Sequence, residues 1–166
     1  MVEQPGRTDL EAYAARIRGD RQLWRELVAA VGDRTDEPGP MGDWTFGDLA
    51  GHLAGWRERL ISRLEAAARG EPEPQPPWPA ELDDDDRIND WIHERDRGRS
   101  AKELIADYDS SFERLAVAVE ALPPRLLEDP AAFGWMGGEA LRDADPTGHL
   151  REEHEPTVRA WLAGRG

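Results

Sequence analysis

The stretch DWTFGDLAGHLAGWRERLISRLEAAARG, residues 43–70, carries the clearest helical pattern in the chain. After Thr45 its apolar residues recur every three or four positions, which places them on one face of an α-helix. These residues are Phe46, Leu49, Leu53, Trp56, Leu60, Leu64 and Ala67. Gly70 ends the pattern, so the stretch predicts one amphipathic helix that packs against others.

A similar pattern lies upstream. Thr8 or Asp9 can cap a helix whose apolar stripe continues to Gly32, and the segment 33–42 that follows is rich in proline and glycine. This segment is too irregular for a further helix. The sequence therefore predicts two helices joined by a loop.

Downstream, residues 71–86 hold five prolines and end in four aspartates. This composition is a poor candidate for packed structure and indicates a long crossover between helices. The aspartates lack the alternating ligand spacing and the twelfth-position glutamate of a calcium loop, so we interpret them as part of a solvated linker.

Three more helices are expected after the crossover. A short one lies between Ile88 and Gly98, and a long one begins after Ser100, with Glu103 in the capping-box position. The last begins near Pro146 and reaches Gly164. No alternating strand pattern of useful length occurs. Four main helices with one long connection predict a single all-α domain over residues 1–166, a four-helix bundle.

Composition excludes several functions. The net charge of −14, from 35 acidic and 21 basic residues, argues against nucleic acid or an anionic membrane as a partner. The chain has no cysteine, so a transition metal would have to be held by histidine and carboxylate. Neither a phosphate-binding glycine loop nor a nucleophile elbow is present. We expect a cytoplasmic protein, because neither a signal sequence nor a membrane-length apolar run is recognisable.

His52 is the first candidate for a functional residue. It lies about 80° from the middle of the apolar stripe of its helix, at the edge of the buried face. Asp48 and Trp56, four residues before and after it, share that flank and could orient the ring or line a pocket. A half-buried histidine with a purely structural hydrogen bond is the alternative.

His149 and His154 form a second candidate group. His154 lies near the centre of the apolar stripe of the last helix, where a buried imidazole needs a hydrogen bond or a metal. On a regular helix His149 would point about 140° away from it. An irregular first turn, or a bulge caused by Pro156, would bring the two together. Alternatively, Glu153 joins His149 as a histidine–carboxylate pair and His154 belongs to the core.

Other candidates are weaker. Trp44 and Trp91 lie in or beside loops, where they would line the mouth of a pocket or simply cover a small core. His93 has no partner pattern and is expected on the surface.

Several segments, taken in order, resemble one family. Trp44-Thr45-Phe46-Gly47-Asp48-Leu49-Ala50-Gly51-His52-Leu53 resembles the Trp-Thr-x-x-Asp-Leu-x-x-His-Leu start of the second helix in the DinB-like superfamily. Ile88–Arg95 with Arg99-Ser100 is similar to its middle segment, and the ending His149–Trp161 resembles its closing His-x-x-Glu-His-x-Pro helix. The superfamily includes the ClbS/DfsB proteins and the N-terminal domain of mycothiol-dependent maleylpyruvate isomerase.

The resemblance implies an up-down-down-up bundle, with the long crossover after the second helix. In many members three histidines from the second and last helices hold a divalent metal. His52 and His154 match two of those positions, whereas the third, four residues before His154, is Leu150, with His149 one residue out of register. Resemblance to a family fixes the fold better than the reaction.

Three functions follow from these observations. The first is an enzyme in which His52, His154 and either His149 or Glu153 hold Zn²⁺ or Ni²⁺, for hydrolysis or for a transferase or isomerase reaction with a low-molecular-weight thiol such as mycothiol. The second is a metal-free binding or self-resistance module for a reactive small molecule. The third is a catalytically inactive bundle that forms a homodimer. The sequence does not name a substrate.

Overall fold

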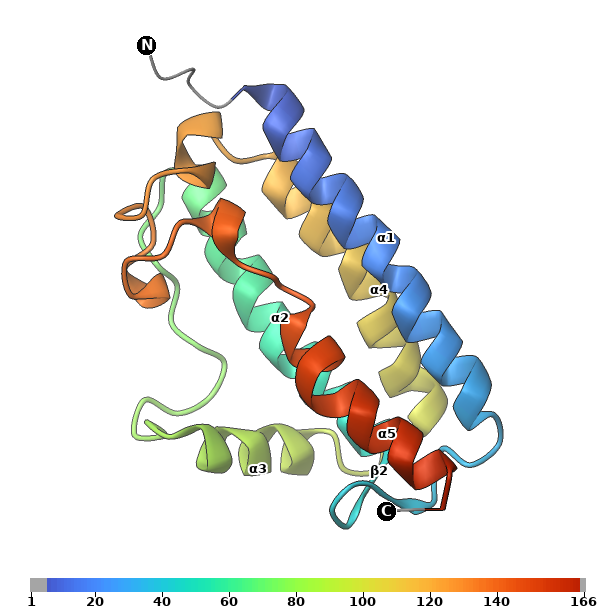
Figure 1. Ribbon diagram of the computed structural model, residues 1–166. Coiled ribbons are helices and arrows are strands. Elements are labelled where there is room, and N and C mark those ends of the chain that lie inside the picture. Colours follow the sequence, from blue (N-terminus) through green and yellow to red (C-terminus); the bar gives the residue numbers. More distant parts are fainter. Residues whose placement is uncertain (1–5, 165–166) are drawn as a thin grey trace.

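The computed structural model describes residues 6–164 and is mainly helical (Figure 1). Within that range there are five α-helices: α1 (Arg7–Val31), α2 (Phe46–Ala68), α3 (Asp85–Arg95), α4 (Ala101–Glu120) and α5 (Glu155–Leu162). A π-helical segment, η4 (Leu150–His154), runs directly into α5. Helices α2 and α4 point in one direction and α1 and α5 in the other, which is the up-down-down-up order (Figure 1). The predicted DinB-like helical bundle is therefore confirmed.

Capping side chains begin the two helices that were predicted most clearly. The Thr45 hydroxyl accepts a hydrogen bond from the Asp48 backbone N–H (3.1 Å), and the Asp48 carboxylate accepts one from the Thr45 N–H (2.9 Å). Ser100 and Glu103 form the same reciprocal pair at α4. At α1 the boundary differs from the prediction. The helix begins at Arg7, and Asp9 accepts the Gly6 N–H instead of capping.

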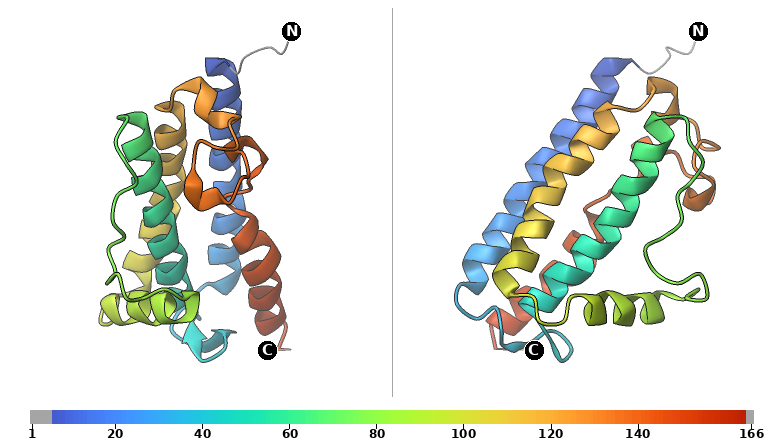
Figure 2. Two further views of the ribbon diagram at one scale, coloured as in Figure 1. Left: turned by 90° about the vertical axis from the view of Figure 1, so that its left-hand side faces the viewer. Right: turned by 180° about the vertical axis from the view of Figure 1, so that it is seen from behind.

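The core lies between α1, α2 and α4. The Trp24 indole, fully buried, stacks on Phe46 with ring centroids 5.1 Å apart and meets the edge of Tyr108 at 4.8 Å. These three rings come from the three long helices, so the apolar stripes read from the sequence meet in one place. In both views of Figure 2, α1 and α4 lie side by side, and α3 crosses the end of the bundle.

Three glycines on α2 allow α3 and the start of α4 to approach closely. Gly47, Gly51 and Gly55 follow one another at four-residue spacing. An added Cβ would lie 2.8 Å from Ala101, 2.8 Å from the Asp96 carboxylate and 2.9 Å from Ile92, respectively. Glycine is therefore required sterically along this face. The close approach brings α3 beside the helix that carries His52.

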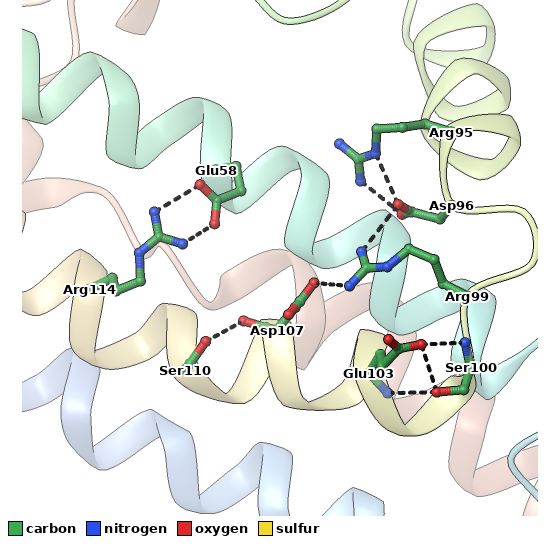
Figure 3. Close-up of polar contacts among 9 residues, drawn as sticks. All are labelled: Glu58, Arg95, Asp96, Arg99, Ser100, Glu103, Asp107, Ser110 and Arg114. Carbon is green, nitrogen blue, oxygen red and sulfur yellow. Dashed lines mark hydrogen bonds and ion pairs between the residues drawn. The ribbon is translucent and has the colours of Figure 1, made fainter.

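Ion pairs fix the corner between α3 and α4 (Figure 3). The buried Asp96 accepts hydrogen bonds from Arg95 (2.8 and 2.9 Å) and from Arg99 (3.4 Å), and Arg99 also reaches Asp107 (2.6 Å). A charge inside the fold needs this kind of compensation. The corner holds α3 across the bundle end.

A short two-stranded ribbon was not predicted. Strands β1 (Pro38–Met41) and β2 (Trp44–Thr45) pair antiparallel. Strand β1 lies inside the segment 33–42 that was expected to be a loop, and β2 lies between that segment and α2. Gly39 has φ +129°, and an added Cβ would meet the Trp161 indole at 2.6 Å. The ribbon thus packs against the C-terminal helix, where only glycine fits.

The connections also carry structure that the sequence pattern did not indicate. The segment after α4 contains three short 3₁₀ turns, η1 (Pro124–Leu127), η2 (Gly134–Met136) and η3 (Leu141–Asp143). The crossover after α2 is irregular, as expected, but Trp78 within it is buried and packs on Trp56 with centroids 5.3 Å apart. None of the described helices is long and apolar enough to cross a membrane.

Candidate metal centre

Three histidines from separate parts of the sequence meet at one point beside α2. The His154 and His149 Nε2 atoms lie 2.9 Å apart, and the His149 and His52 Nε2 atoms 3.5 Å apart. One ring nitrogen from each of the three lies within 4.8 Å of those of the other two. We call this set, His52, His149 and His154, the histidine trio.

The π-helical segment η4 explains how His149 reaches the trio. In a π-turn the backbone bond spans five residues, and here the Glu155 N–H donates to the Leu150 carbonyl. Two side chains five residues apart then lie on the same face, whereas a regular α-helix would turn them away from each other. Pro156 lacks the N–H that would bond the Glu152 carbonyl in a regular helix, which favours the wider turn. The bulge considered from the sequence is therefore present.

The spacing of the nitrogens suits a divalent cation. In a tetrahedral site with metal–nitrogen bonds of about 2.0–2.1 Å, two ligand nitrogens lie roughly 3.4 Å apart. The observed separations of 2.9 and 3.5 Å lie on either side of that value. Three protein ligands also leave a coordination position free for a small molecule, as in catalytic sites. The trio could therefore hold a metal ion.

The protonation states agree with this interpretation. Burial, reinforced by the other two histidines, lowers the pKa of His52 from 6.5 to about 4. Burial and the neighbouring His149 likewise lower the pKa of His154 to about 4. Both rings are therefore neutral at neutral pH, which is the form that binds metals. His52 Nδ1 is buried and has no hydrogen-bond partner among the described residues.

His149 and Glu153 form the outer side of the trio. The His149 side chain is about half exposed, and its Nδ1 lies 3.2 Å from a Glu153 carboxylate oxygen. A carboxylate on the far nitrogen of a metal-binding imidazole orients the ring and leaves Nε2 available. The expected pair of His149 and Glu153 is therefore present, but His154 lies in the trio beside it and is not left to the core.

A hollow of about 310 Å³ opens beside the trio. We call it the histidine pocket, and its walls are His52, Trp56, Asp85, Asn89 and His149. The Trp56 indole N–H donates to the Asn89 side chain (2.8 Å), which fixes α3 against α2 at the wall. Two of these lining residues, Asp85 and His149, are exposed to solvent.

The remaining residues singled out from the sequence lie elsewhere. One carboxylate oxygen of Asp48 accepts the Thr45 N–H at the start of α2, and the other lies 3.2 Å from His93 Nε2. The Trp44 ring stacks on the His93 ring, with centroids 4.6 Å apart, and the Trp44 and His52 ring centroids lie 6.0 Å apart. Trp91 belongs to a separate apolar cluster around Trp78, and the structure does not bring it to the histidine pocket.

Sequence reasoning missed the contribution of α3. His93 was expected on the surface without a partner, but it is only about one-third exposed and contacts both Asp48 and Trp44. Asp85 and Asn89 line the pocket and were not singled out. The signal was present, because Asp85, Asn89 and His93 follow at four-residue spacing and therefore share one face of a helix.

Comparison with protein families identifies a family to which most of the chain is similar. Residues 17–152 match the model of the mycothiol maleylpyruvate isomerase N-terminal domain. The match covers most of the chain and includes His52 and His149, and it ends two residues before His154. Searches of curated proteins and of solved structures give no significant match.

Proposed function

Because the chain belongs to the family of mycothiol maleylpyruvate isomerase N-terminal domains, and because its three histidines converge, we propose that it is a metal-dependent enzyme that uses a low-molecular-weight thiol. His52, His149 and His154 would hold zinc or nickel. The convergence of the three ring nitrogens is the observation that carries the proposal. The name of the family, which specifies mycothiol, supports the choice of this thiol over water as the nucleophile.

A divalent ion at the trio supplies Lewis acidity, which lowers the pKa of a thiol or water that reaches it and makes a nucleophile available at neutral pH. The chain's own groups would do the rest. His52 and His154 are held in place by burial, while Glu153 orients His149 through Nδ1. Trp56 and Asn89 close one wall of the pocket, so the thiol and its reaction partner enter from the solvent side of His149.

Metal analysis of the purified protein tests the first half of this proposal. After incubation with zinc and gel filtration, the wild type should retain about one equivalent. The variants His52→Ala, His149→Ala and His154→Ala should lose it. His93→Ala is the matched control, because it removes the one histidine outside the trio and should retain the metal. A wild type with less than about a tenth of an equivalent would exclude the metal and favour the metal-free binding module.

Thiol binding tests the second half. Calorimetry would compare mycothiol with its S-methyl derivative on zinc-loaded and on chelator-treated protein. We expect the free thiol to bind more tightly when zinc is present and the S-methyl derivative to show no such dependence. Equal binding of both compounds with zinc would contradict the thiol role and leave hydrolysis as the metal-dependent alternative.

A further inference from the structure

Arg57 on α2 is a buried cation without an anionic partner. Its side chain is 4% exposed, and among residues 6–164 no carboxylate lies within ion-pair distance of it. Nη2 donates to the Tyr108 hydroxyl and to the Pro146 carbonyl, both at 3.2 Å. Nη1 is buried and has no hydrogen-bond partner there. An unpaired charge away from water is costly, so its position needs an explanation.

The neighbouring arginine shows what a compensated site looks like in the same helix. Arg59, two residues later, is 5% exposed, but its Nη2 lies 2.6 Å from the Glu73 carboxylate. Its Nη1 donates to the Pro74 carbonyl at 2.6 Å. The crossover thus supplies a counter-charge for Arg59, whereas Arg57 keeps its charge with only neutral acceptors and the faces of Tyr108 and Phe112.

Arg57 also lines a hollow. This arginine pocket, of about 160 Å³, is bounded by Leu53, Trp56, Arg57, Leu60, Tyr108, Pro146, His149 and Leu150. It shares Trp56 and His149 with the histidine pocket, so the two hollows adjoin at those side chains. A molecule whose reacting group lies at the trio can therefore place a second group near Arg57.

We propose that Arg57 binds a carboxylate of the substrate. One carboxylate carries one negative charge and so balances one guanidinium, whereas a phosphate dianion would leave an excess of negative charge in a buried site. The planar guanidinium fork also matches the two oxygens of a carboxylate. Apolar walls of Leu53, Leu60 and Leu150 exclude water and strengthen the pair. This inference deepens the proposed function and rests on it for the reaction, but the binding itself needs no metal.

The test uses 3-phenylpropionate and its uncharged analogue 3-phenylpropionamide. Binding is followed by the NMR signal of the Trp56 indole N–H, assigned with Trp56→Phe, because this residue lines both pockets. Each titration is run with zinc and with a chelator. We expect the acid to bind at least about tenfold more tightly than the amide under both conditions, since a charge-assisted bond is made only by the acid.

Variants assign the preference to Arg57. Arg57→Gln should abolish the discrimination between acid and amide, and Arg57→Lys, which keeps the charge, should retain part of it. Arg59→Gln is the control for loss of a buried arginine from α2 and should discriminate as the wild type does. Equal binding of acid and amide by the wild type, failure of the acid to bind, or full discrimination by Arg57→Gln would overturn the proposal. If the protein takes up no zinc after incubation with it but still discriminates acid from amide, the metal site is refuted and the role of Arg57 stands.

Discussion

Two regions of the bundle treat their polar groups in opposite ways. Between α1 and α4, Arg18 pairs with Glu113 (2.9 Å) and Glu120 (2.6 Å), and Arg21 and Arg25 share Asp109. These charges are mutually satisfied at the surface. Between α2 and the C-terminal segment, buried polar atoms remain without hydrogen-bond partners among the described residues: His52 Nδ1, Arg57 Nη1 and Thr147 Oγ1.

The α1–α4 face and the region between α2 and the C-terminal segment therefore have different roles. Exposed ion pairs contribute little stability each, so the α1–α4 face orders the long helices without needing a ligand. Buried unsatisfied groups lower stability, so each needs an explanation, and a bound ligand is one. His52 and Arg57 line the two pockets, whereas the other residues with such atoms, Trp24, Arg59 and Thr147, do not. This region is therefore where we expect binding to stabilise the protein.

Changing the length of the π-segment should break the site most strongly. Inserting one alanine between Glu152 and Glu153 separates His149 and His154 by six residues, a spacing that no regular turn brings together. Zinc affinity should fall by roughly 100-fold or more, because a ligand is lost outright. Deleting Glu152 is the matched control, since the four-residue spacing it creates suits an ordinary α-helix and should preserve binding. Competition with a zinc indicator measures both, and an insertion variant with wild-type affinity would refute the role of the π-turn.

Acid should destabilise the region around the histidine trio before it destabilises the ion-paired face between α1 and α4. His52 and His154 have a folded-state pKa of about 4, below the ordinary 6.5, so the unfolded chain binds more protons between these values. In the metal-free protein, stability is full above about pH 6.5 and is lost as the pH falls towards 4, by about 2 kcal/mol or more. Urea unfolding in chelator at several pH values measures this. The double variant His52→Leu/His154→Leu should show a smaller slope, and an equal slope would contradict the assignment.

The carboxylate behind His149 gives a smaller effect. Glu153→Gln should weaken zinc binding by roughly 10-fold to 100-fold, because the neutral amide orients and polarises the imidazole less well. Glu152→Gln removes the adjacent exposed carboxylate and should leave the affinity unchanged. Indicator competition again provides the measurement. If both variants bind zinc equally, Glu153 does not support the ligand.

On the paired face the effect should be smallest. Arg18→Gln removes a guanidinium that makes four hydrogen bonds to Glu113 and Glu120, yet it should cost less than about 1 kcal/mol of unfolding free energy because all three side chains remain partly in contact with water. Zinc content should not change. A loss above about 2 kcal/mol would show that these ion pairs contribute more to stability than surface pairs usually do.

The sequence predicts the bundle well because its signals are repetitive. The stripe that begins at Phe46 and the caps at Thr45 and Ser100 each specify local structure, and the long crossover determines which helices run parallel. The strand at Pro38–Met41 could not be predicted in this way, because it depends on the packing of Gly39 against Trp161, far away in the sequence. Tertiary contacts of this kind have no local pattern.

The site can be predicted only in part from the sequence, again because it depends on tertiary contacts. His52 and His154 can be singled out from the sequence because they are histidines on or beside the apolar stripes of their helices. The position of His149, in contrast, depends on one extra residue in a helical turn. Pro156 signals that an irregularity is favourable without specifying a π-turn. Arg57 gives no signal at all in sequence, because an arginine near an apolar stripe is usually at the surface and its lack of a partner is visible only in three dimensions.

The most direct test of the account is a crystal structure of the zinc-loaded protein with anomalous data at the zinc edge. We predict one strong peak bonded at about 2.0–2.2 Å to the Nε2 atoms of His52, His149 and His154, with the π-turn at Leu150–His154 retained. A peak bonded to only two of these histidines, a peak elsewhere, or a regular helix with His149 in solvent would contradict it.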